Sequence, residues 1–387
     1  MKAFPDFASY ISTLTGFAET GQPSDRFDAW QQSLDKLLLQ TTKNFTRYVD
    51  VSNDLFRTTS LYVSAAVRWY ATSNSYRFEY DSAAKIIFPQ MDLICSSKGD
   101  SSVIHNTHGT YYPNKELFSG EGGNVNWLRA GWDEKTVHAE FSKYFIDITK
   151  AEFTADSVSF YNSTYFNKPL QGKFTDKILA NVTAENASYP KFESYTANFE
   201  INNIVPDVNY LGGFSMVGNR MMGSGNQDED ARLLFYRDKK LFLVAGSNAF
   251  VVRKDKITAD NASITIYYGK DSIYHPGVEF KYIVKDRELA LIRGGDGKNQ
   301  SPCFDSFHNL DLYFDALYWK IDDPIIDMKM ISGAGESKAV FESSNFFRKN
   351  RFLKLQGLSE THPMYSVKQY CERHDTKVVY ANELAKD

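Results

Sequence analysis

The sequence predicts a mainly β protein, an elongated antiparallel array of strands with helical segments at its N-terminal and C-terminal ends. Aromatic residues make up 15% of the chain, with 29 Phe and 24 Tyr, and such residues suit half-buried strands. Short runs of β-branched and aromatic residues follow one another through the middle of the chain, separated by charged or Gly/Asn/Asp breaks. This rhythm is typical of successive antiparallel strands, which would form a β-groove, a roll or a stack of β units.

The first 60 residues are predicted to be helical. Trp30, Leu34 and Leu37 recur at three- and four-residue spacing with polar residues between them, which gives a helix one apolar face. We expect residues 1–60 to form a helical N-terminal segment that packs against the array.

A second helical segment is predicted at the C-terminal end, over residues 346–387. Thr361 is expected to cap a helix there, with Pro363 in its first turn and an end near His374. This segment would cap the array or link it to a following module.

The region between the two helical segments, residues 61–345, is predicted to be β-rich. Tyr76–Tyr80, Lys85–Phe88 and Met91–Cys95 are short strand-like runs with turns between them. The clearest stretch is Ala231–Gly295, in which four runs follow one another in the manner of a β-meander.

Two similar sequence segments suggest how the β-rich region is organised. Phe153–Tyr161 and Ile257–Thr265 share an apolar-Thr-Ala-Asp-x-apolar-Ser-apolar pattern, and their threonines lie 104 residues apart. Either a duplication or a coincidence within a strand-rich chain accounts for the similarity. A duplication would divide the array into units 153–256 and 257–345, each burying its face against its neighbour.

Charge and composition exclude several classes of protein. The net charge is −4, the isoelectric point is near 6.0 and Lys and Arg never form a basic run, so no nucleic-acid partner is predicted. No window approaches the ~18 consecutive apolar residues of a membrane span, so no transmembrane span is expected in this chain. Cys95, Cys303 and Cys371 are too few and too far apart for a disulfide framework or a zinc pattern, although one long-range disulfide stays open.

The two ends of the sequence give different indications of compartment. The N-terminus lacks the positive region and the following apolar region of a signal peptide, which taken alone indicates a cytoplasmic chain. Tyr380–Asp387 looks like the opening of a helix that is then cut off. We therefore expect a piece of a longer protein, for which a missing signal peptide says little about compartment.

Two glycine-bearing motifs do not meet the spacing that their chemistry requires. Gly213–Gly218 carries Ser215 but has one residue too many for the Gly-x-Ser-x-Gly nucleophile elbow. Gly294–Asn299 contains a Gly-Lys pair, yet no Ser or Thr follows Lys298, so a phosphate-binding loop is not predicted.

Two short pairs are half-sites for a metal ion. His105 and His108 lie three residues apart, and so do Cys371 and His374. Neither pair has further ligands close in sequence, whereas a zinc site takes three or four protein ligands. We predict no metal site and no cofactor.

The densest group of acidic and imidazole side chains is Asp305, His308, Asp311 and Asp315, and Asp228–Asp230 is the other acidic group. A glycosidase needs two carboxylates across a cleft. Strand alternation places Asp311 and Asp315 on a solvated face, and the second group falls in a turn. The interpretation that we favour is therefore structural, and a catalytic site is the alternative.

Three tryptophans are candidate binding residues, because aromatic rings on a β face can contact sugar rings or acyl chains. Trp127, Trp132 and Trp319 each stand beside a glycine or an acidic turn. Alternation places Trp127 on the same face of a short strand as Val125. The competing interpretation is that such rings pair with other aromatic residues across strands.

The stretch Gly122–Gly131 and the two Thr-Ala-Asp strands resemble segments of large uncharacterised cell-envelope proteins of Gram-negative bacteria. The resemblance covers most of the chain, but that family has no catalytic motif to transfer. In strand rhythm alone the chain is also similar to the periplasmic parts of lipopolysaccharide-assembly and translocation proteins, which fold as open β-grooves that hold acyl chains. The resemblance implies a cell-envelope or periplasmic location.

These observations favour a non-enzymatic envelope protein that acts as a scaffold or binding surface, with a lipid, a glycan or another envelope protein as partner. The alternative is a carbohydrate-active or other hydrolase with its site around Asp305–Asp315. An apolar trough along the strands would support the first function, and converging carboxylates would support the second.

Overall fold

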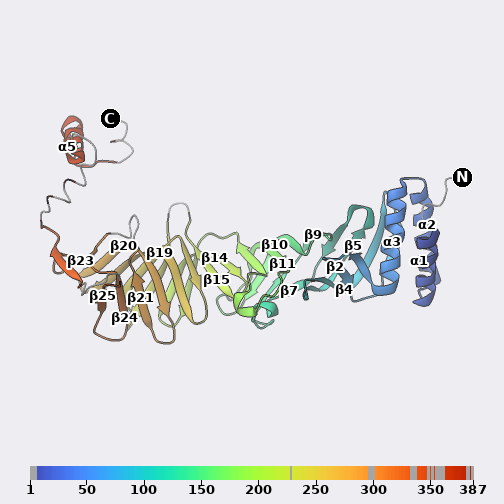
Figure 1. Cartoon of the computed structure of the whole chain (residues 1–387), viewed down its shortest axis with the longest axis horizontal. Helices are drawn as coiled ribbons and strands as arrows, with labels where there is room; N and C mark the ends of the chain where they lie inside the picture. Colours follow the sequence, from blue (N-terminus) through green and yellow to red (C-terminus); the bar gives the residue numbers. More distant parts are fainter. Residues whose placement is uncertain are drawn as a thin grey trace.

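The computed structural model describes residues 7–226, 229–294, 301–331, 338–346 and 362–380, together with residues 349, 353 and 384. The protein is mainly β, with a large antiparallel arrangement of many strands and helices at both ends (Figure 1). The predicted fold class is therefore confirmed. Figure 1 shows that the strands follow one another along the long axis of the molecule, starting from the N-terminal helices.

The α-helices with bounds in the described ranges are α1 (Phe7–Glu19), α2 (Ser24–Leu38), α3 (Thr42–Thr58) and, after the array, α5 (Pro363–His374). The helix α5 begins and ends where the sequence predicts, and its N-cap is His362, whose Nδ1 accepts a hydrogen bond of 3.1 Å from the Met364 N–H. Thr361, the predicted cap, lies outside the described residues. None of the helices in the described ranges combines the length and the apolar character that a membrane-spanning helix requires.

The first half of the array contains β1 (Ser60–Val63), β2 (Arg68–Ala71), β3 (Arg77–Tyr80), β4 (Ala84–Ser97), β5 (Asp100–Tyr112), β6 (Leu117–Glu121), β7 (Asn124–Asn126), β8 (Val137–Glu140), β9 (Lys143–Asp147), β10 (Glu152–Asn162), β11 (Leu170–Lys177), β12 (Lys191–Ser194) and β13 (Phe199–Val205). The second half contains β14 (Val208–Val217), β15 (Arg220–Ser224), β16 (Ala231–Arg237), β17 (Lys240–Ser247), β18 (Ala249–Val252), β19 (Lys256–Tyr268), β20 (Asp271–Ile283), β21 (Glu288–Ile292), β22 (Cys303–Asp305), β23 (Leu310–Tyr313), β24 (Ala316–Lys320), β25 (Asp327–Lys329) and β26 (Val340–Ser343).

Long bent strands join two layers of the second half, as the hairpin β19–β20 shows. The first part of β19 pairs with β18, and its second part pairs with β17. The strand β20 likewise pairs with β21 through one part and with β22 through the other. One layer thus includes β15, β18, β21, β24 and β25, and the other layer includes β13, β16, β17, β22, β23 and β26.

The predicted β-meander over Ala231–Gly295 is therefore only partly a meander. The strands β19, β20 and β21 are consecutive neighbours, as expected. The short strand β18, which the sequence pattern did not reveal, pairs with β15 and leaves β17 to pair with β19. Gly295 itself lies outside the described residues.

The two Thr-Ala-Asp segments mark β-bulges at the bends of two long strands. Register shifts occur between Ala155 and Val158 in β10 and between Ala259 and Ala262 in β19. At both places two consecutive exposed residues interrupt the alternation of buried and exposed side chains. An extra residue resets that alternation, so the strand directs apolar side chains to the core on both sides of its bend. The left-handed φ of 56° at Ser157 belongs to the first bulge.

A β-bulge also stands where the sequence predicted a turn between two strands. Lys85–Phe88 and Met91–Cys95 were expected as two strands, but they form the single strand β4. Its register against β5 shifts between Phe88 and Met91, and the two exposed residues there belong to a bulge. Since Pro89 lacks an N–H, this bulge is a position at which a strand tolerates it.

Aromatic side chains fill the space between the layers and run on into the helical N-terminal segment. In the first half of the molecule successive ring centroids lie 4.2–6.4 Å apart. Such pairs contribute about 0.5–1.5 kcal/mol each beyond the burial of area. The rings are, in order, Trp30, Phe56, Phe78, Tyr76, Phe88, Phe118, Tyr144, Phe153, Phe174, Trp127, Phe160 and Phe192.

The N-terminal helices close the first end of this core. Trp30 on α2 is fully buried and donates a hydrogen bond of 2.8 Å from Nε1 to the Ser52 hydroxyl on α3. Phe56 and Tyr48 on α3 place their rings 5.8 and 6.0 Å from that of Phe78 on β3. The apolar face that the sequence predicts for this segment thus covers the end of the array.

Replacing Ile264 with Asp tests the assignment of the buried face of β19. Ile264 is 2% exposed, and a carboxylate there would lose its water without gaining a partner, at a cost of several kcal/mol. We expect a large fall in melting temperature or aggregation. Thr265→Asp, on the opposite face of the same strand, should melt close to the wild type, and equal melting of both variants would contradict the assignment.

Candidate functional site

The predicted acidic cluster is brought together only in part. Asp305 ends β22, and one of its carboxylate oxygens lies 2.8 Å from His308 Nδ1. The other oxygen accepts hydrogen bonds from the Tyr268 hydroxyl and, at 2.9 Å, from the Phe307 N–H. Burial alone raises the pKa of Asp305, but these hydrogen bonds outweigh it and hold the pKa below its usual range. Burial and the bond to Asp305 raise the pKa of Tyr268 to about 12.

Asp311 and Asp315 do not join this group. The register of β22 and β23 sets Asp311 opposite Phe304 and sets Asp305 opposite Leu310, so the two carboxylates belong to opposite faces of the sheet. Asp315 follows β23, and its side chain accepts a hydrogen bond of 2.9 Å from the Ile331 N–H. The cluster therefore lacks the two carboxylates facing one another across a cleft that a glycosidase uses.

The environment of Asp305 predicts a pH-dependent contribution to stability. Because its pKa is lowered on folding, the ionised carboxylate stabilises the folded protein above about pH 4, and that stabilisation is lost as the pH falls through the lowered pKa. Asp305→Asn should lower the free energy of unfolding by about 1–3 kcal/mol at pH 7 and by less at pH 3, as measured by urea unfolding. Asp311→Asn, the control, should change it by at most about 0.5 kcal/mol at either pH. A deficit of equal size at both pH values would contradict this role of Asp305.

The three candidate tryptophans are each at most 7% exposed, although Trp132 lines a separate hollow of about 480 Å³. Trp127 is fully buried, as is Val125 on β7, but Trp127 follows the end of that strand. Trp319 is 7% exposed, and its Nε1 donates a hydrogen bond of 2.9 Å to the Asp323 carbonyl. Trp132 is also 7% exposed, with the Lys254 ammonium 4.4 Å from its ring centre.

The weaker motifs lie in ordinary structural positions. Ser215 is in the middle of β14, paired with Met222 on one side and Glu193 on the other, and is not on a strand-to-helix turn. His105 places Nδ1 3.1 Å from an Asp92 carboxylate oxygen. Among the described residues no three His, Cys, Asp or Glu side chains gather as metal ligands, and the three cysteines are free thiols. Residues 295–299 and Asp228 lie outside the described ranges.

Five side chains that are neighbours across strands form a row on the outer face of the layer that contains β16, β17 and β22. The sequence alone did not reveal this row. Each member of this outer row pairs directly with the next across β16, β17, β19, β20 and β22, and each is half-buried or exposed. Tyr274 and Phe304 are 43% and 37% exposed. The outer row consists of Leu234, Val244, Thr265, Tyr274 and Phe304.

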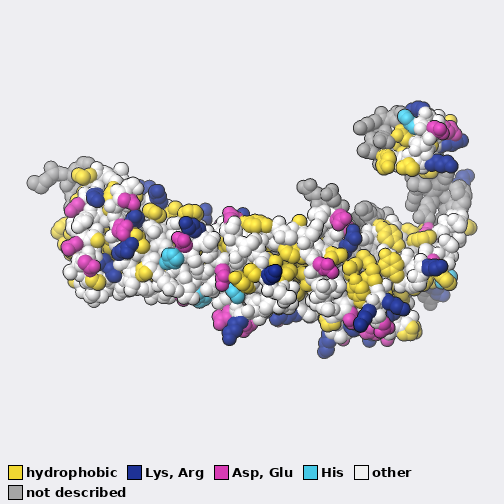
Figure 2. Space-filling model, turned by 180° about the vertical axis from the view of Figure 1, so that it is seen from behind, with side chains coloured by type: hydrophobic (Ala, Val, Ile, Leu, Met, Phe, Trp, Pro, Cys, Tyr) yellow, Lys and Arg dark blue, Asp and Glu magenta, His cyan; other side chains and the backbone are white. Residues whose placement is uncertain are grey.

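The outer row continues into the acidic side chain of Asp311, which pairs with Phe304. Hydrophobic side chains gather at the surface over the middle and C-terminal parts of the array, and they are sparse over the N-terminal helices (Figure 2). Tyr274 and Phe304 are the exposed members of the outer row, and large exposed apolar patches are candidate interaction sites.

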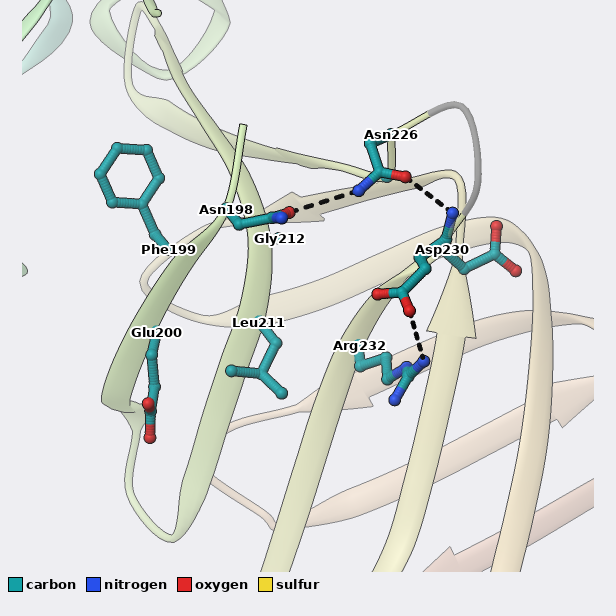
Figure 3. Close-up of a pocket in the computed structure, with 10 residues that line it drawn as sticks. Asn198, Phe199, Glu200, Leu211, Gly212, Asn226, Asp230 and Arg232 are labelled. Atoms are coloured by element: carbon teal, nitrogen blue, oxygen red, sulfur yellow. Dashed lines mark hydrogen bonds and ion pairs between the residues drawn. The ribbon is translucent and has the colours of Figure 1, made fainter. Parts of the chain in front are cut away.

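A hollow of about 320 Å³ adjoins the outer row on β16 (Figure 3). Leu211 of β14 lies in the middle of it, flanked across the strands by Glu200 of β13 and Arg232 of β16. Arg232 is two residues from Leu234, so both belong to the same face of β16. The hollow is lined by Asn198, Phe199, Glu200, Leu211, Gly212, Gly225, Asn226, Glu229, Asp230 and Arg232.

A glycine lies beneath the hollow, on the core side of β14. Gly212 has a φ of 151°, and a Cβ there would lie 2.5 Å from the Tyr210 hydroxyl and 2.8 Å from the Ala231 Cβ. A side chain at this position would therefore displace two strands that line the hollow. The strand β13 bounds it as an edge strand that pairs, within the described ranges, with β14 alone.

Polar groups from separate segments converge around the hollow. The Asn226 side-chain oxygen accepts a hydrogen bond of 2.7 Å from the Glu229 N–H, and its amide nitrogen lies 3.5 Å from the Asn198 side-chain oxygen. The Arg232 guanidinium lies 4.0 Å from the Glu229 carboxylate. The lining holds three carboxylates and one guanidinium, so it favours a neutral or cationic ligand over an anion.

Comparison with protein families, with curated proteins and with solved structures gave no match for this chain.

Proposed function

We propose that this protein is a non-enzymatic binding scaffold that holds an extended glycan along the outer row and in the adjoining hollow. The observation that carries the proposal is the continuity of the two features on one face of one layer. Tyr274 and Phe304 offer aromatic surface, and the hollow offers amide, carboxylate and guanidinium groups. A sugar ring has apolar C–H faces and hydroxyls that both donate and accept hydrogen bonds, so it complements both features.

A glycan is favoured over an acyl chain because of where the apolar surface lies. The interior between the layers is occupied by packed aromatic rings, and an acyl chain would need a trough that buries most of its surface. The outer row lies on the outer face of its layer, with Asp311 at one end and Arg232 near the other. The cell-envelope setting is part of the proposal, and its support is the sequence resemblance.

The hydrolase alternative has less support. Asp305 and His308 form one close pair, but Asp311 belongs to the opposite face of the sheet and Asp315 to the turn before β24. A binding function needs no such convergence of carboxylates. The proposal therefore gives Phe304 and Tyr274 a direct role and leaves Asp305 a structural one.

Replacing Tyr274 with Ala tests the proposal through binding. The chain would be applied to an array of neutral and amino-sugar oligosaccharides, and the tightest ligand would be followed by calorimetry. Losing one aromatic contact should weaken binding by about fivefold to tenfold, equivalent to about 1 kcal/mol. Phe145→Ala, at an aromatic position on β9 that is 64% exposed against 43% for Tyr274, is the control and should bind as the wild type does.

Two results would refute the glycan assignment. One is the absence of binding to every oligosaccharide on the array. The other is binding that Tyr274→Ala and Phe145→Ala weaken to the same extent. Capture of phospholipid vesicles in place of oligosaccharides would assign the outer row to an acyl ligand.

A further inference from the structure

Both layers end in edge strands at the C-terminal end of the array. Within the described ranges β25 pairs with β24 alone and β26 pairs with β23 alone. Large apolar side chains are exposed beside these strands, including Ile325 at 71% and Ile331 at 59%. The first end of the array is covered by α2 and α3, whereas no described helix is packed on this end. An exposed edge with apolar side chains is a template for pairing with another chain.

The sequence around β25 is close to a palindrome. It reads Ile325-Ile-Asp-Met-Lys-Met-Ile331, with Met328 at its centre. An antiparallel pairing of two copies centred on Met328 sets Ile325 opposite Ile331, and it sets Asp327 opposite Lys329. Apolar pairs and opposite-charge pairs of this kind stabilise adjacent strands by about 0.2–1 kcal/mol each.

Backbone directions on β25 agree with this register. The Lys329 carbonyl accepts a hydrogen bond of 2.9 Å from the Asp315 N–H, and the Ile331 N–H donates one of 2.9 Å to the Asp315 side chain. Both bonds point toward β24. Because backbone groups alternate in direction along a strand, those of Met328 and Met330 point to the side of β25 on which no described strand pairs, where a second copy can pair with them.

The side chains agree as well. Asp327 and Lys329 are each about 60% exposed and lie 3.8 Å apart within one copy. Ile326, Met328 and Met330 are partly buried against the core. In the paired arrangement the charged side chains lie on the outer face, and the partly buried ones extend the core of one copy toward that of the other.

We propose that two copies of this protein form a symmetric dimer through β25, with the two-fold axis at Met328 and one sheet continuous across both copies. The contact is isologous, since each copy contributes the same strand in the opposite direction. Its specificity comes from the two Asp327–Lys329 pairs, which form only in the antiparallel register.

Charge reversal tests this register through the mass of the protein in solution. By size-exclusion chromatography with light scattering, the wild type should be a dimer, and Asp327→Lys and Lys329→Asp should each be monomeric because both pairs become repulsive. An equimolar mixture of the two variants should form a dimer, because their charges are then opposite at both pairs. The double variant should also recover the dimer.

Lys191→Glu is the matched control. Lys191 forms a 2.7 Å ion pair with Glu193 two residues along β12, but that strand is flanked by β11 and β14, so the variant should remain dimeric. A wild type that is monomeric at every concentration would overturn the proposal. So would a dimer that survives Lys329→Asp, or two monomeric variants that fail to pair when mixed. Near-ultraviolet circular dichroism shows that each variant is folded.

Discussion

The constraint on which the rest of the structure depends is the filled aromatic core between two strand layers. Each fully buried large side chain contributes about 1.5–3 kcal/mol, and the rings contact one another from Trp30 in the helices to Phe192 in β12. A core enclosed by two layers grows by adding hairpins at its end, which makes the molecule long. Such an array has two ends to cover, and the N-terminal helices cover the first.

The filled core also explains the β-bulges and the location of the proposed binding surface. A strand that serves both layers must keep apolar side chains inward on each side of its bend, and one extra residue restores that alternation. The bulges of β10 and β19 do this at the two Thr-Ala-Asp sequences. Because the interior is occupied, the proposed ligand recognition falls to the outer faces, where Tyr274 and Phe304 lie.

Local patterns in the sequence were sufficient for the fold class and the helical ends. They were not sufficient for the site, because its residues meet through strand pairings between distant segments. The outer row is defined by the register of five strands, which a single sequence does not disclose. Trp127 was a candidate ligand contact because its neighbours are polar and glycine-rich, but the bend of the chain places it in the core.

The central claim is that one continuous core unites the array, and native-state hydrogen exchange tests it most directly. We expect slowly exchanging amides in the inner strands from β4 to β21, with no fast-exchanging boundary between them. A zone of fast exchange across β11, β12 and the part of β14 that pairs with β12, separating two blocks that open independently, would contradict the claim and divide the molecule into two modules.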